Sequence, residues 1–568
     1  MTIAPTTDRG SLPAWCRYYG DVPASLVYPD RSLYQTVRLT VERIPDAVAC
    51  EFLGGTVSYR ELGRRIERIA DALAALGLRA GDRLLIVMPT SPQAVVAYYA
   101  ANALGAVAAL VHPLSAAAEI EGYARASGSR IALTLDALYP RLAPALDTGA
   151  IATLVLTRLA DGLPLLTRAG FWLARGRRIP RVPPDGRVRW WAELMDEPHA
   201  KAPRPIRDPS TLGTILFSGG TTGMPKGIML SDRNIISNGI QVARWVNMRE
   251  GDRTLAVLPL FHGFGLSTLV NAPLMTGCRV ILVPEFSARV VAQLIQGSRP
   301  NFIAGVPSLY DALSRRGALE GVDLSCIKAA FSGGDTLPLR VKEGFDRLLA
   351  EGGSRARLLE GYGLTENVTA AVVMPLHHER PGSTGVPLPD VLVSIREPES
   401  GSEMPIGEPG EICISGPAVM LGYLNDPAAT AVALRRHEDG RTWLHTGDIG
   451  RRDADGWFCF LGRRKRMIKS SGYNVFPGEV EQVLCAHPDV AETYVMGVPD
   501  DSRGERVRAY VVPQPDAATG DLVARLTVHC AERLARWSCP REIVLRSRLP
   551  RNRVGKVDQR ALLEGPAE

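Results

Sequence analysis

The chain has 568 residues, of which 46% are hydrophobic and 22% are charged, so it can fold as a globular protein of several structural units. Its formal net charge of +6 is small for this length and gives no indication of a nucleic-acid-binding protein. The nine cysteines lie far apart, without a CxxC pair or clustered histidines, which excludes a conventional zinc motif and favours a reducing cytosol. Because Met1 to Gly10 lack the features of a secretory signal, we expect a cytoplasmic protein.

Short apolar strands alternate with longer helical stretches in the first part of the chain. The run 83–88 follows an alanine-rich helical stretch at 67–76, and further runs with strand composition occur at 254–259, 279–284 and 301–306. This alternation predicts an α/β fold of mainly parallel sheets with helices, in which ligands bind where the strands end.

The longest apolar run, 95–111, contains Asn102 and Gly105. It is shorter than the roughly 20 residues that a helix needs to cross a bilayer. We therefore expect a buried helix here and no membrane span.

The pattern changes after Asp390, where shorter strands such as 410–415 and 456–460 are separated by turns. These strands predict an antiparallel subdomain. The charged segment 462–466 then precedes about a hundred residues with their own strands and helices, a size adequate for an independent domain. We expect a large N-terminal domain over 1–463 and a small α+β C-terminal domain over 464–568, joined by a hinge.

A loop rich in glycine and hydroxyl side chains follows the apolar strand 214–217. Glycines let the backbone approach an anion, while hydroxyls and a lysine can bind phosphate oxygens. The candidate phosphate-binding residues are Ser218, Gly219, Gly220, Thr221, Thr222, Gly223 and Lys226. Since Pro225 precedes Lys226 and Gly227 follows it, the loop does not match the Gly-Lys-Ser/Thr pattern of P-loop NTPases. The structural alternative is a flexible surface loop.

Several separate motifs accompany this loop. They are Leu258-Pro-Leu-Phe-His-Gly-Phe-Gly265, Ser332-Gly-Gly-Asp335, Glu360-Gly-Tyr-Gly-Leu-Thr-Glu366, Trp443-Leu-His-Thr-Gly-Asp448 and Leu549-Pro-Arg-Asn-Arg-Val-Gly-Lys-Val-Asp558. With the loop, they resemble the motifs of the adenylate-forming (AMP-binding) superfamily, which includes acyl-CoA synthetases, luciferases and nonribosomal adenylation domains. The resemblance covers nearly the whole chain, and Gly219 makes the loop similar to that of long-chain fatty acyl-CoA synthetases.

The resemblance implies an ATP site. Tyr362 would stack on adenine, and Gly334 and Asp335 would line the adenine site. Asp448, assisted by Arg463, would accept hydrogen bonds from the ribose hydroxyls. Read without the resemblance, Asp448 is a turn cap and Arg463 is a solvated charge.

The resemblance also implies the groups that act on the phosphates and the acid. Thr365 would contact the α-phosphate, and Glu366 with Ser218 would hold Mg2+, a cation that prefers oxygen ligands. Lys556 would be the adenylation catalyst, because a long cationic side chain can bridge the substrate carboxylate and the phosphate. His262 would lie beside the acyl pocket, although a lone histidine in an apolar run is often a core residue.

A second step would transfer the acyl group to coenzyme A after the small domain rotates. Lys465 matches the hinge position of the family, and Gly472 would leave room for the thiol arm in the pantetheine tunnel. Lys465 is equally explained as a linker charge. The resemblance thus implies an ATP-dependent acid–thiol ligase that forms an acyl-adenylate and then acyl-CoA.

The acid itself is predicted to be a medium- or long-chain fatty acid. Aryl acids are an alternative substrate class, and a carrier protein is an alternative acceptor. A non-catalytic nucleotide-binding scaffold is the alternative from another functional class, and the retention of Lys226, Glu366, Asp448 and Lys556 argues against it. The oligomeric state is open.

An insertion at 160–191 interleaves arginines with leucine, phenylalanine and tryptophan. Segments of this kind can lie on an anionic membrane surface, where long-chain acids are found. The alternative, which we favour, is a solvated loop or lid.

Overall fold

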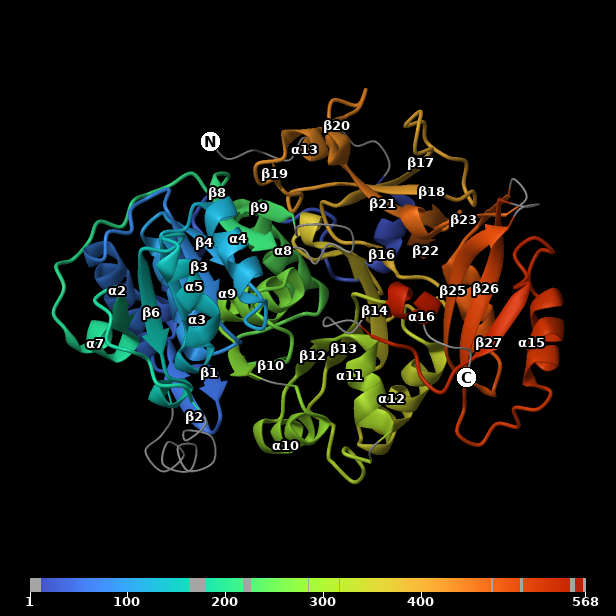
Figure 1. The fold of residues 1–568 in the computed structure, drawn as a ribbon, viewed down its shortest axis with the longest axis horizontal. Coiled ribbons are helices and arrows are strands. Elements are labelled where there is room, and N and C mark those ends of the chain that lie inside the picture. The colour runs from blue at the N-terminus through green and yellow to red at the C-terminus, as the bar shows by residue number, and fades with distance from the viewer. Residues whose placement is uncertain are drawn as a thin grey trace.

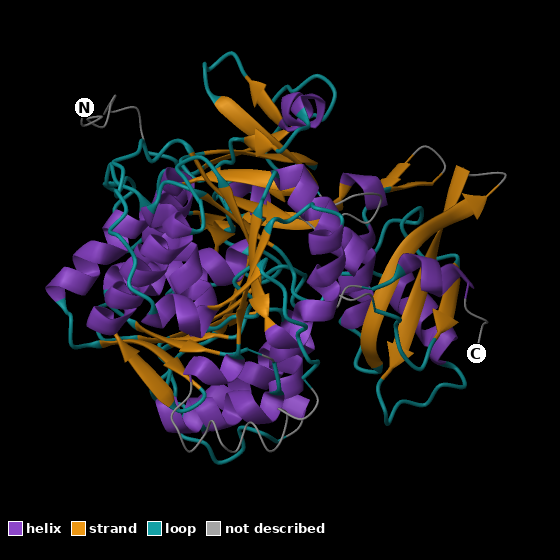
Figure 2. Cartoon of the chain, turned by 60° about the vertical axis from the view of Figure 1, so that its left-hand side comes forward, coloured by secondary structure: helices purple, strands orange, loops and turns teal. Residues whose placement is uncertain are grey.

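The computed structural model describes residues 12–162, 179–217, 226–284, 286–315, 317–470, 473–500, 504–551 and 557–564. Within these ranges the strands form four sheets, of eight, nine, five and five strands (Figure 1). Figure 2 shows helices packed around the larger sheets, with the C-terminal sheet and its helices set to one side.

The eight-stranded sheet has the order β19-β9-β8-β4-β3-β5-β6-β7. Its strands are β3 (Arg83–Val87), β4 (Val107–Leu110), β5 (Ile131–Leu135), β6 (Thr153–Thr157), β7 (Val188–Trp190), β8 (Leu212–Phe217), β9 (Gly227–Ser231) and β19 (Gly422–Tyr423). Strands β3 to β8 pair in parallel, and the accompanying helices are α3 (Pro92–Ala103), α4 (Ala117–Ser127), α5 (Tyr139–Asp147) and α7 (Trp191–Asp196). By contrast, β8 and β9 are antiparallel, with Phe217 paired to Gly227, so the predicted phosphate-binding loop connects two paired strands.

The nine-stranded sheet has the order β16-β15-β14-β13-β12-β10-β11-β1-β2. Its strands are β1 (Val48–Phe52), β2 (Gly55–Ser58), β10 (Arg253–Ala256), β11 (Arg279–Leu282), β12 (Phe302–Gly305), β13 (Ala329–Ser332), β14 (Leu358–Gly363), β15 (Ala370–Val373) and β16 (Val386–Pro387). Its helices are α1 (Leu33–Arg43), α2 (Tyr59–Ala75), α8 (Asp232–Trp245), α9 (Ala272–Thr276), α10 (Ala288–Ser298), α11 (Pro307–Arg315) and α12 (Leu339–Glu351), with the π-helix η5 (Phe264–Asn271) before α9. The central strands β1, β11, β10, β12, β13 and β14 are parallel, as predicted from the alternating pattern.

The third sheet is antiparallel throughout, which confirms the change of pattern predicted after Asp390. It contains β17 (Leu392–Arg396), β18 (Gly410–Ser415), β20 (Leu434–Arg436), β21 (Thr442–Arg452) and β22 (Phe458–Arg463), with α13 (Pro427–Ala433) alongside. The fourth sheet lies C-terminal to it. Its elements are β23 (Ile468–Ser470), β24 (Tyr473–Val475), α14 (Pro477–Cys485), β25 (Val490–Asp500), β26 (Gly504–Pro513), α15 (Leu522–Ala531), β27 (Glu542–Leu545) and α16 (Gln559–Glu564), and it has a separate hydrophobic core.

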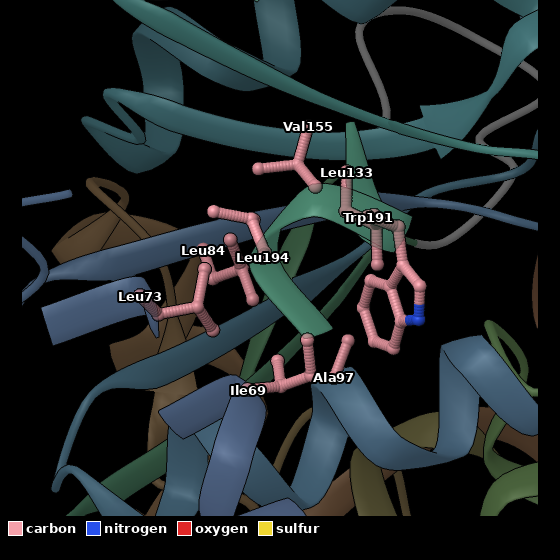
Figure 3. Close-up of a pocket in the computed structure, with 8 residues that line it drawn as sticks. All are labelled: Ile69, Leu73, Leu84, Ala97, Leu133, Val155, Trp191 and Leu194. Atoms are coloured by element: carbon pink, nitrogen blue, oxygen red, sulfur yellow. The ribbon is translucent and has the colours of Figure 1, made fainter. Parts of the chain in front are cut away.

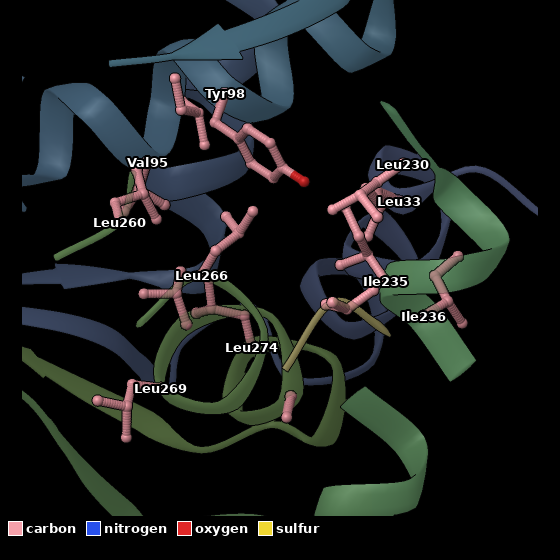
Figure 4. Close-up of a cluster of buried hydrophobic side chains, with 14 of the residues drawn as sticks. Leu33, Val95, Tyr98, Leu230, Ile235, Ile236, Leu260, Leu266, Leu269 and Leu274 are labelled. Carbon is pink, nitrogen blue, oxygen red and sulfur yellow. The ribbon is translucent and has the colours of Figure 1, made fainter. Parts of the chain in front are cut away.

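One hydrophobic core contains residues of both large sheets and of the helices α1, α3, α8 and α9 (Figure 4). Helix α3 begins at the N-cap Ser91, whose hydroxyl accepts the Ala94 N–H, and has Pro92 in its first turn. All its residues are buried, so it has no polar face. The Tyr98 hydroxyl hydrogen-bonds the Thr214 hydroxyl (3.1 Å), which satisfies both buried groups.

The apolar run 95–111 is not a single helix, so that prediction is wrong in its second half. Helix α3 ends at Ala103, Gly105 adopts a φ of +74°, and the chain continues as β4. Glycine tolerates this left-handed conformation, and strands buried on both faces are as continuously apolar as a buried helix. Among the described residues no helix is long and apolar enough to cross a membrane.

Candidate active site

Two neighbouring parallel strands bring the predicted adenine-site residues together. Gly334, at a φ of +81°, and Asp335 follow β13, while Tyr362 lies near the end of β14. A Cβ atom on Gly333 would lie 3.0 Å from the carbonyl oxygen of Gly361, so the two backbones approach closely. The Asp335 side chain is exposed and accepts a hydrogen bond from the next residue's N–H (2.9 Å).

The motif 360–366 begins as a strand and ends in a short 3-10 helix. Its first residues continue β14 to Gly363, and Thr365 and Glu366 belong to the short 3-10 helix η6 (Thr365–Asn367). A side chain at position 363 would collide with the carbonyl oxygen of Thr369, so only glycine fits where the strand ends.

Tyr362, Asp448 and Arg463 come together although they lie on three different strands. The Tyr362 hydroxyl donates to Oδ2 of Asp448 (2.8 Å), and Nε of Arg463 lies 3.5 Å from Oδ1 of the same carboxylate. The Tyr362 ring stacks on Phe460, with 5.7 Å between centroids and 27° between planes. Tyr362 is 9% exposed and Asp448 4%, so the carboxylate is buried and paired. Burial, and then the charge of Asp448, raises the pKa of Tyr362 well above its ordinary value, which keeps its hydroxyl a donor.

Asp448 lies inside strand β21, so the alternative interpretation of Asp448 as a turn cap is wrong. The pairing of β21 with β18 shifts register at this point, which makes a bulge. Within the bulge Gly447 has a φ of +70°, and the Asp448 N–H donates to Oγ1 of Thr446 (3.0 Å). The bulge re-aims the strand so that the Asp448 carboxylate meets Tyr362.

Tyr423 connects two predicted phosphate-site residues and was not singled out in the sequence. Its hydroxyl donates to Oε1 of Glu366 (3.0 Å), and Nζ of Lys226 lies 4.5 Å from the centroid of its ring. Tyr423 reaches this place because β19 pairs with β9, the strand that follows Lys226. Burial, and then the neighbouring Glu366, raises the pKa of Tyr423. No motif spacing in the sequence connects these three positions.

The residues around Glu366 fit a magnesium–phosphate group. Its carboxylate offers the hard oxygen ligand that Mg2+ prefers, and the Lys226 ammonium beside Tyr423 suits phosphate oxygens. The other predicted ligand, Ser218, lies outside the described residues.

His262 lies on an exposed turn before the π-helix η5. Its Nδ1 accepts a hydrogen bond from the Phe264 N–H (3.2 Å). A side chain on Gly263 would collide with the carbonyl oxygen of Val368, so this turn packs directly against the end of η6. The fold therefore places the His262 turn beside the Thr365 segment.

Lys465 lies in a short 3-10 helix, η7 (Arg464–Arg466), between the last strand of the third sheet and the first strand of the fourth. Its side chain is exposed, whereas Arg466 pairs with Glu481 (2.8 Å). The remaining predicted site residues, which are Ser218, Gly219, Gly220, Thr221, Thr222, Gly223, Gly472 and Lys556, lie outside the described residues.

A small apolar pocket lies away from all of these residues (Figure 3). Its lining side chains are Ile69, Leu73, Leu84, Ala97, Leu133, Val155, Trp191 and Leu194. It carries no polar group that could orient a substrate, so we interpret it as a packing gap between α2, α3, α7 and the eight-stranded sheet.

Comparison with known families identifies the family to which the chain belongs. The pattern of the AMP-binding enzyme family matches residues 37–424, and that of the AMP-binding enzyme C-terminal domain matches residues 479–556. The chain belongs to the AMP-binding enzyme family. It is 32% identical to a long-chain-fatty-acid–CoA ligase of Bacillus subtilis, over 99% of each chain. It is 31% identical to 4-coumarate–CoA ligase 2 of rice (Oryza sativa subsp. japonica), over 88% of this chain and 85% of that one.

A solved member of the family has the same architecture. This solved structure is O-succinylbenzoate coenzyme A synthetase from Bacillus subtilis in complex with ATP and magnesium ion, whose sequence is 28% identical to this chain. The two structures superpose with a TM-score of 0.75, and the match covers 93% of this chain and 99% of that chain. The predicted fold class, family and activity are confirmed. This AMP-binding enzyme is an ATP-dependent acyl-CoA synthetase that uses ATP, Mg2+ and CoA.

Proposed function

We propose that the acyl substrate is a medium- or long-chain fatty acid. The observation that carries this proposal is the match to the Bacillus subtilis long-chain-fatty-acid–CoA ligase, which extends over 99% of both chains. The match to the coumarate ligase leaves part of that protein uncovered, at 85% of its length. Gly219 in the phosphate loop supports the same assignment.

An aryl acid is the second candidate substrate. It is favoured by a feruloyl-CoA synthase of Amycolatopsis, which is 33% identical over 90% of this chain. The two relatives are similarly identical to this chain, at 32% and 33%, so an assay with both substrate classes decides between the two candidates.

The test is pyrophosphate release with saturated fatty acids of graded length and with coumarate and ferulate, each with and without CoA. The proposal expects the highest kcat/KM with one of the longer fatty acids and formation of the thioester only with CoA. A higher kcat/KM with either aryl acid would overturn it. Repeating the assay with a phosphopantetheinylated carrier protein in place of CoA tests the alternative acceptor.

For the first half-reaction, we propose that Tyr362 and Asp448 hold the adenosine while a carboxylate oxygen of the acid attacks the α-phosphorus. The bond to the pyrophosphate oxygen breaks, and an acyl-adenylate forms. Thr365 and Lys556 would neutralise charge on the α-phosphate, and Lys226 would hold the leaving pyrophosphate. Glu366 and Ser218 would hold Mg2+, which would supply further positive charge to the phosphates when bound.

For the second half-reaction, we propose a rotation of the segment 464–568 about Lys465. The CoA thiol loses its proton to solvent, its sulfur attacks the acyl carbonyl carbon, and AMP leaves with the electrons of the broken C–O bond. Two contacts of this segment with the rest of the chain are partly exposed and polar: Nη2 of Arg340 donates to the Ala491 carbonyl (3.1 Å), and Arg451 lies 3.8 Å from Glu479. Contacts of this kind contribute about 0–1 kcal/mol each, so they would oppose rotation weakly.

Lys556→Ala tests the division of labour between the two half-reactions. We expect it to abolish adenylation and to leave thioester formation from supplied acyl-AMP and CoA largely intact. Equal loss of both activities would overturn the rotation proposal.

We propose that the insertion 160–191 does not contact a membrane and that the enzyme acts in the cytoplasm. Its residues 188–190 form strand β7, which pairs with β6 in the eight-stranded sheet. Arg187 pairs with Asp185 (2.6 Å), Arg189 pairs with Glu197 (2.9 Å), and Trp191 is buried. These side chains are therefore engaged within the protein, while residues 163–178 lie outside the described ranges. All nine cysteines are free, which fits a reducing compartment. If deleting 163–178 lowers co-sedimentation with anionic liposomes, the membrane alternative is correct.

A further inference from the structure

A hydrogen-bonded chain, buried at Glu411 and His445, lies behind the bulge that carries Asp448. The Glu411 side chain reaches from β18 into the bulge, where its Oε1 accepts a hydrogen bond from the Gly447 N–H (2.8 Å). Its Oε2 lies 2.9 Å from Nδ1 of His445. On the other side of that ring, Nε2 of His445 lies 3.0 Å from Nε2 of His437, which follows β20.

The chemistry of these groups fixes the direction of the hydrogen bonds. An ionised Glu411 can only accept, so Nδ1 of His445 donates to it, and Nε2 of His445 shares a hydrogen bond with Nε2 of His437. Burial alone would raise the pKa of Glu411, but the hydrogen bonds from His445 and Gly447 outweigh burial and hold that pKa below its usual range. The bulge therefore contains a fixed negative charge with both oxygens satisfied.

The same side chains are spaced closely enough to hold a metal ion. Ligand atoms of Glu411, Cys413 and His445 lie within 4.8 Å of one another, and all three residues are buried. However, a cation between them would have to displace the bond between Glu411 and His445, which already joins two of the three ligand atoms. Hydrogen bonding explains the arrangement without an ion.

The bulge backbone is held by side chains at successive positions. Oγ1 of Thr446 donates to the Ile412 carbonyl (2.7 Å) and accepts the Asp448 N–H (3.0 Å). Glu411 holds the intervening Gly447 N–H. A shift of Gly447 would therefore move the Asp448 carboxylate away from the Tyr362 hydroxyl.

We propose that Glu411, supported by His445 and His437, is a positioning residue that sets the Asp448 carboxylate for the ribose of ATP. This inference rests on the proposed ribose-binding role of Asp448. On this proposal the buried Glu411 carboxylate touches no substrate, yet it controls how well the enzyme distinguishes ribose from deoxyribose.

The test compares kcat/KM for ATP with kcat/KM for 3′-deoxy-ATP in pyrophosphate release. Their ratio, measured on one enzyme sample, does not depend on the folded fraction, so partial unfolding of a variant cannot mimic the effect. Asp448→Ala gives the reference value of this ratio for an enzyme that lacks the Asp448 carboxylate. Glu411→Ala is expected to lower kcat/KM for ATP roughly tenfold or more, with a smaller loss for 3′-deoxy-ATP.

Glu411→Gln is the conservative variant. Its amide oxygen still accepts the Gly447 N–H, and its amide nitrogen can donate to Nδ1 of His445 if the proton of that ring moves to Nε2 and donates to His437. It should therefore retain most of the discrimination. Cys413→Ala, a buried change beside the chain, should leave the ratio unchanged.

The outcomes separate the two proposals. If Asp448→Ala keeps the wild-type ratio, the proposed ribose role of Asp448 is wrong. If Asp448→Ala lowers the ratio but Glu411→Ala lowers both kcat/KM values equally, Glu411 is merely structural and the positioning proposal is overturned.

Discussion

Removing the hydroxyl of Tyr362 tests how the buried nucleotide site is organised. Tyr362→Phe keeps the ring and its stack on Phe460, but it deletes the donor to Oδ2 of Asp448. Asp448 is 4% exposed, and the Arg463 side chain 3.5 Å away is itself exposed, so solvent screens much of that ion pair. The hydroxyl is therefore the better-placed partner of a buried charge.

The expected magnitude follows from the class of interaction. A hydrogen bond to a charged group contributes about 1.5–3 kcal/mol, which corresponds to roughly 10- to 150-fold in binding. If Asp448 binds the ribose as proposed, we expect the KM for ATP to rise within this range at saturating acid, because the carboxylate loses the hydrogen bond that holds it. The change in kcat should be smaller, since the proposal places the Tyr362 hydroxyl beside the adenosine and not beside the reacting phosphate.

The assay is pyrophosphate release at varied ATP, with thermal unfolding measured in parallel. Phe460→Leu is the matched control, because it removes the ring stack and retains the hydroxyl bond. An ATP KM within about twofold of wild type, together with a lower unfolding temperature, would refute the reasoning and leave the Tyr362 hydroxyl with a stabilising role only.

Other predictions concern the neighbouring motif residues. Burial raises the pKa of Glu360 to about 7 from an ordinary 4.5. Between these two pH values the folded protein keeps a proton on Glu360 that the unfolded protein has released, so the free energy of unfolding falls as the pH rises from 4.5 through 7. Glu360→Gln should remove this pH dependence and stabilise the protein at pH 8 by up to about 3 kcal/mol. If the free energy of unfolding changes equally with pH in the wild type and the variant, this prediction is wrong. Tyr423→Phe should raise the Mg2+ concentration for half-maximal activity severalfold, because the hydroxyl that orients Glu366 is lost, whereas an unchanged Mg2+ titration would exclude that role. Gly363→Ala should lower adenylation at least tenfold and destabilise the fold by about 1–3 kcal/mol, since its Cβ would collide with the Thr369 carbonyl oxygen. A variant that unfolds in urea like the wild type would show that the backbone at the end of β14 can move to accommodate the methyl group.

The sequence predicted the parallel and antiparallel regions because their patterns differ over many residues. It misjudged places where one residue changes the conformation. Gly105 divides an apolar run into α3 and β4, and the run is predominantly apolar on both sides of it. Periodicity cannot separate a buried strand from a buried helix in such a run.

The candidate site was predicted through motifs, and its connections were not. Tyr362 and Asp448 were both named from the sequence, but their hydrogen bond depends on a bulge in β21 that no local pattern indicates. Neither Tyr423 nor Glu411 lies in a motif that the sequence analysis connected with the site. Each becomes relevant only because strand pairing brings it beside a predicted residue, Glu366 in one case and the Gly447 bulge in the other.

The position of Arg463 would couple nucleotide binding to the proposed rotation. Arg463 is the last residue of β22, pairs in register with Asp448, and directly precedes η7, which connects the third sheet to the fourth. If the segment 464–568 rotates about Lys465 as proposed, a nucleotide that draws the Arg463 guanidinium inward acts on residues next to the pivot. Nucleotide occupancy and the orientation of the segment 464–568 would then be thermodynamically linked. A nucleotide analogue would shift the equilibrium between the two orientations by the ratio of its affinities for them, and a restraint that holds one orientation would change the nucleotide affinity by the same factor.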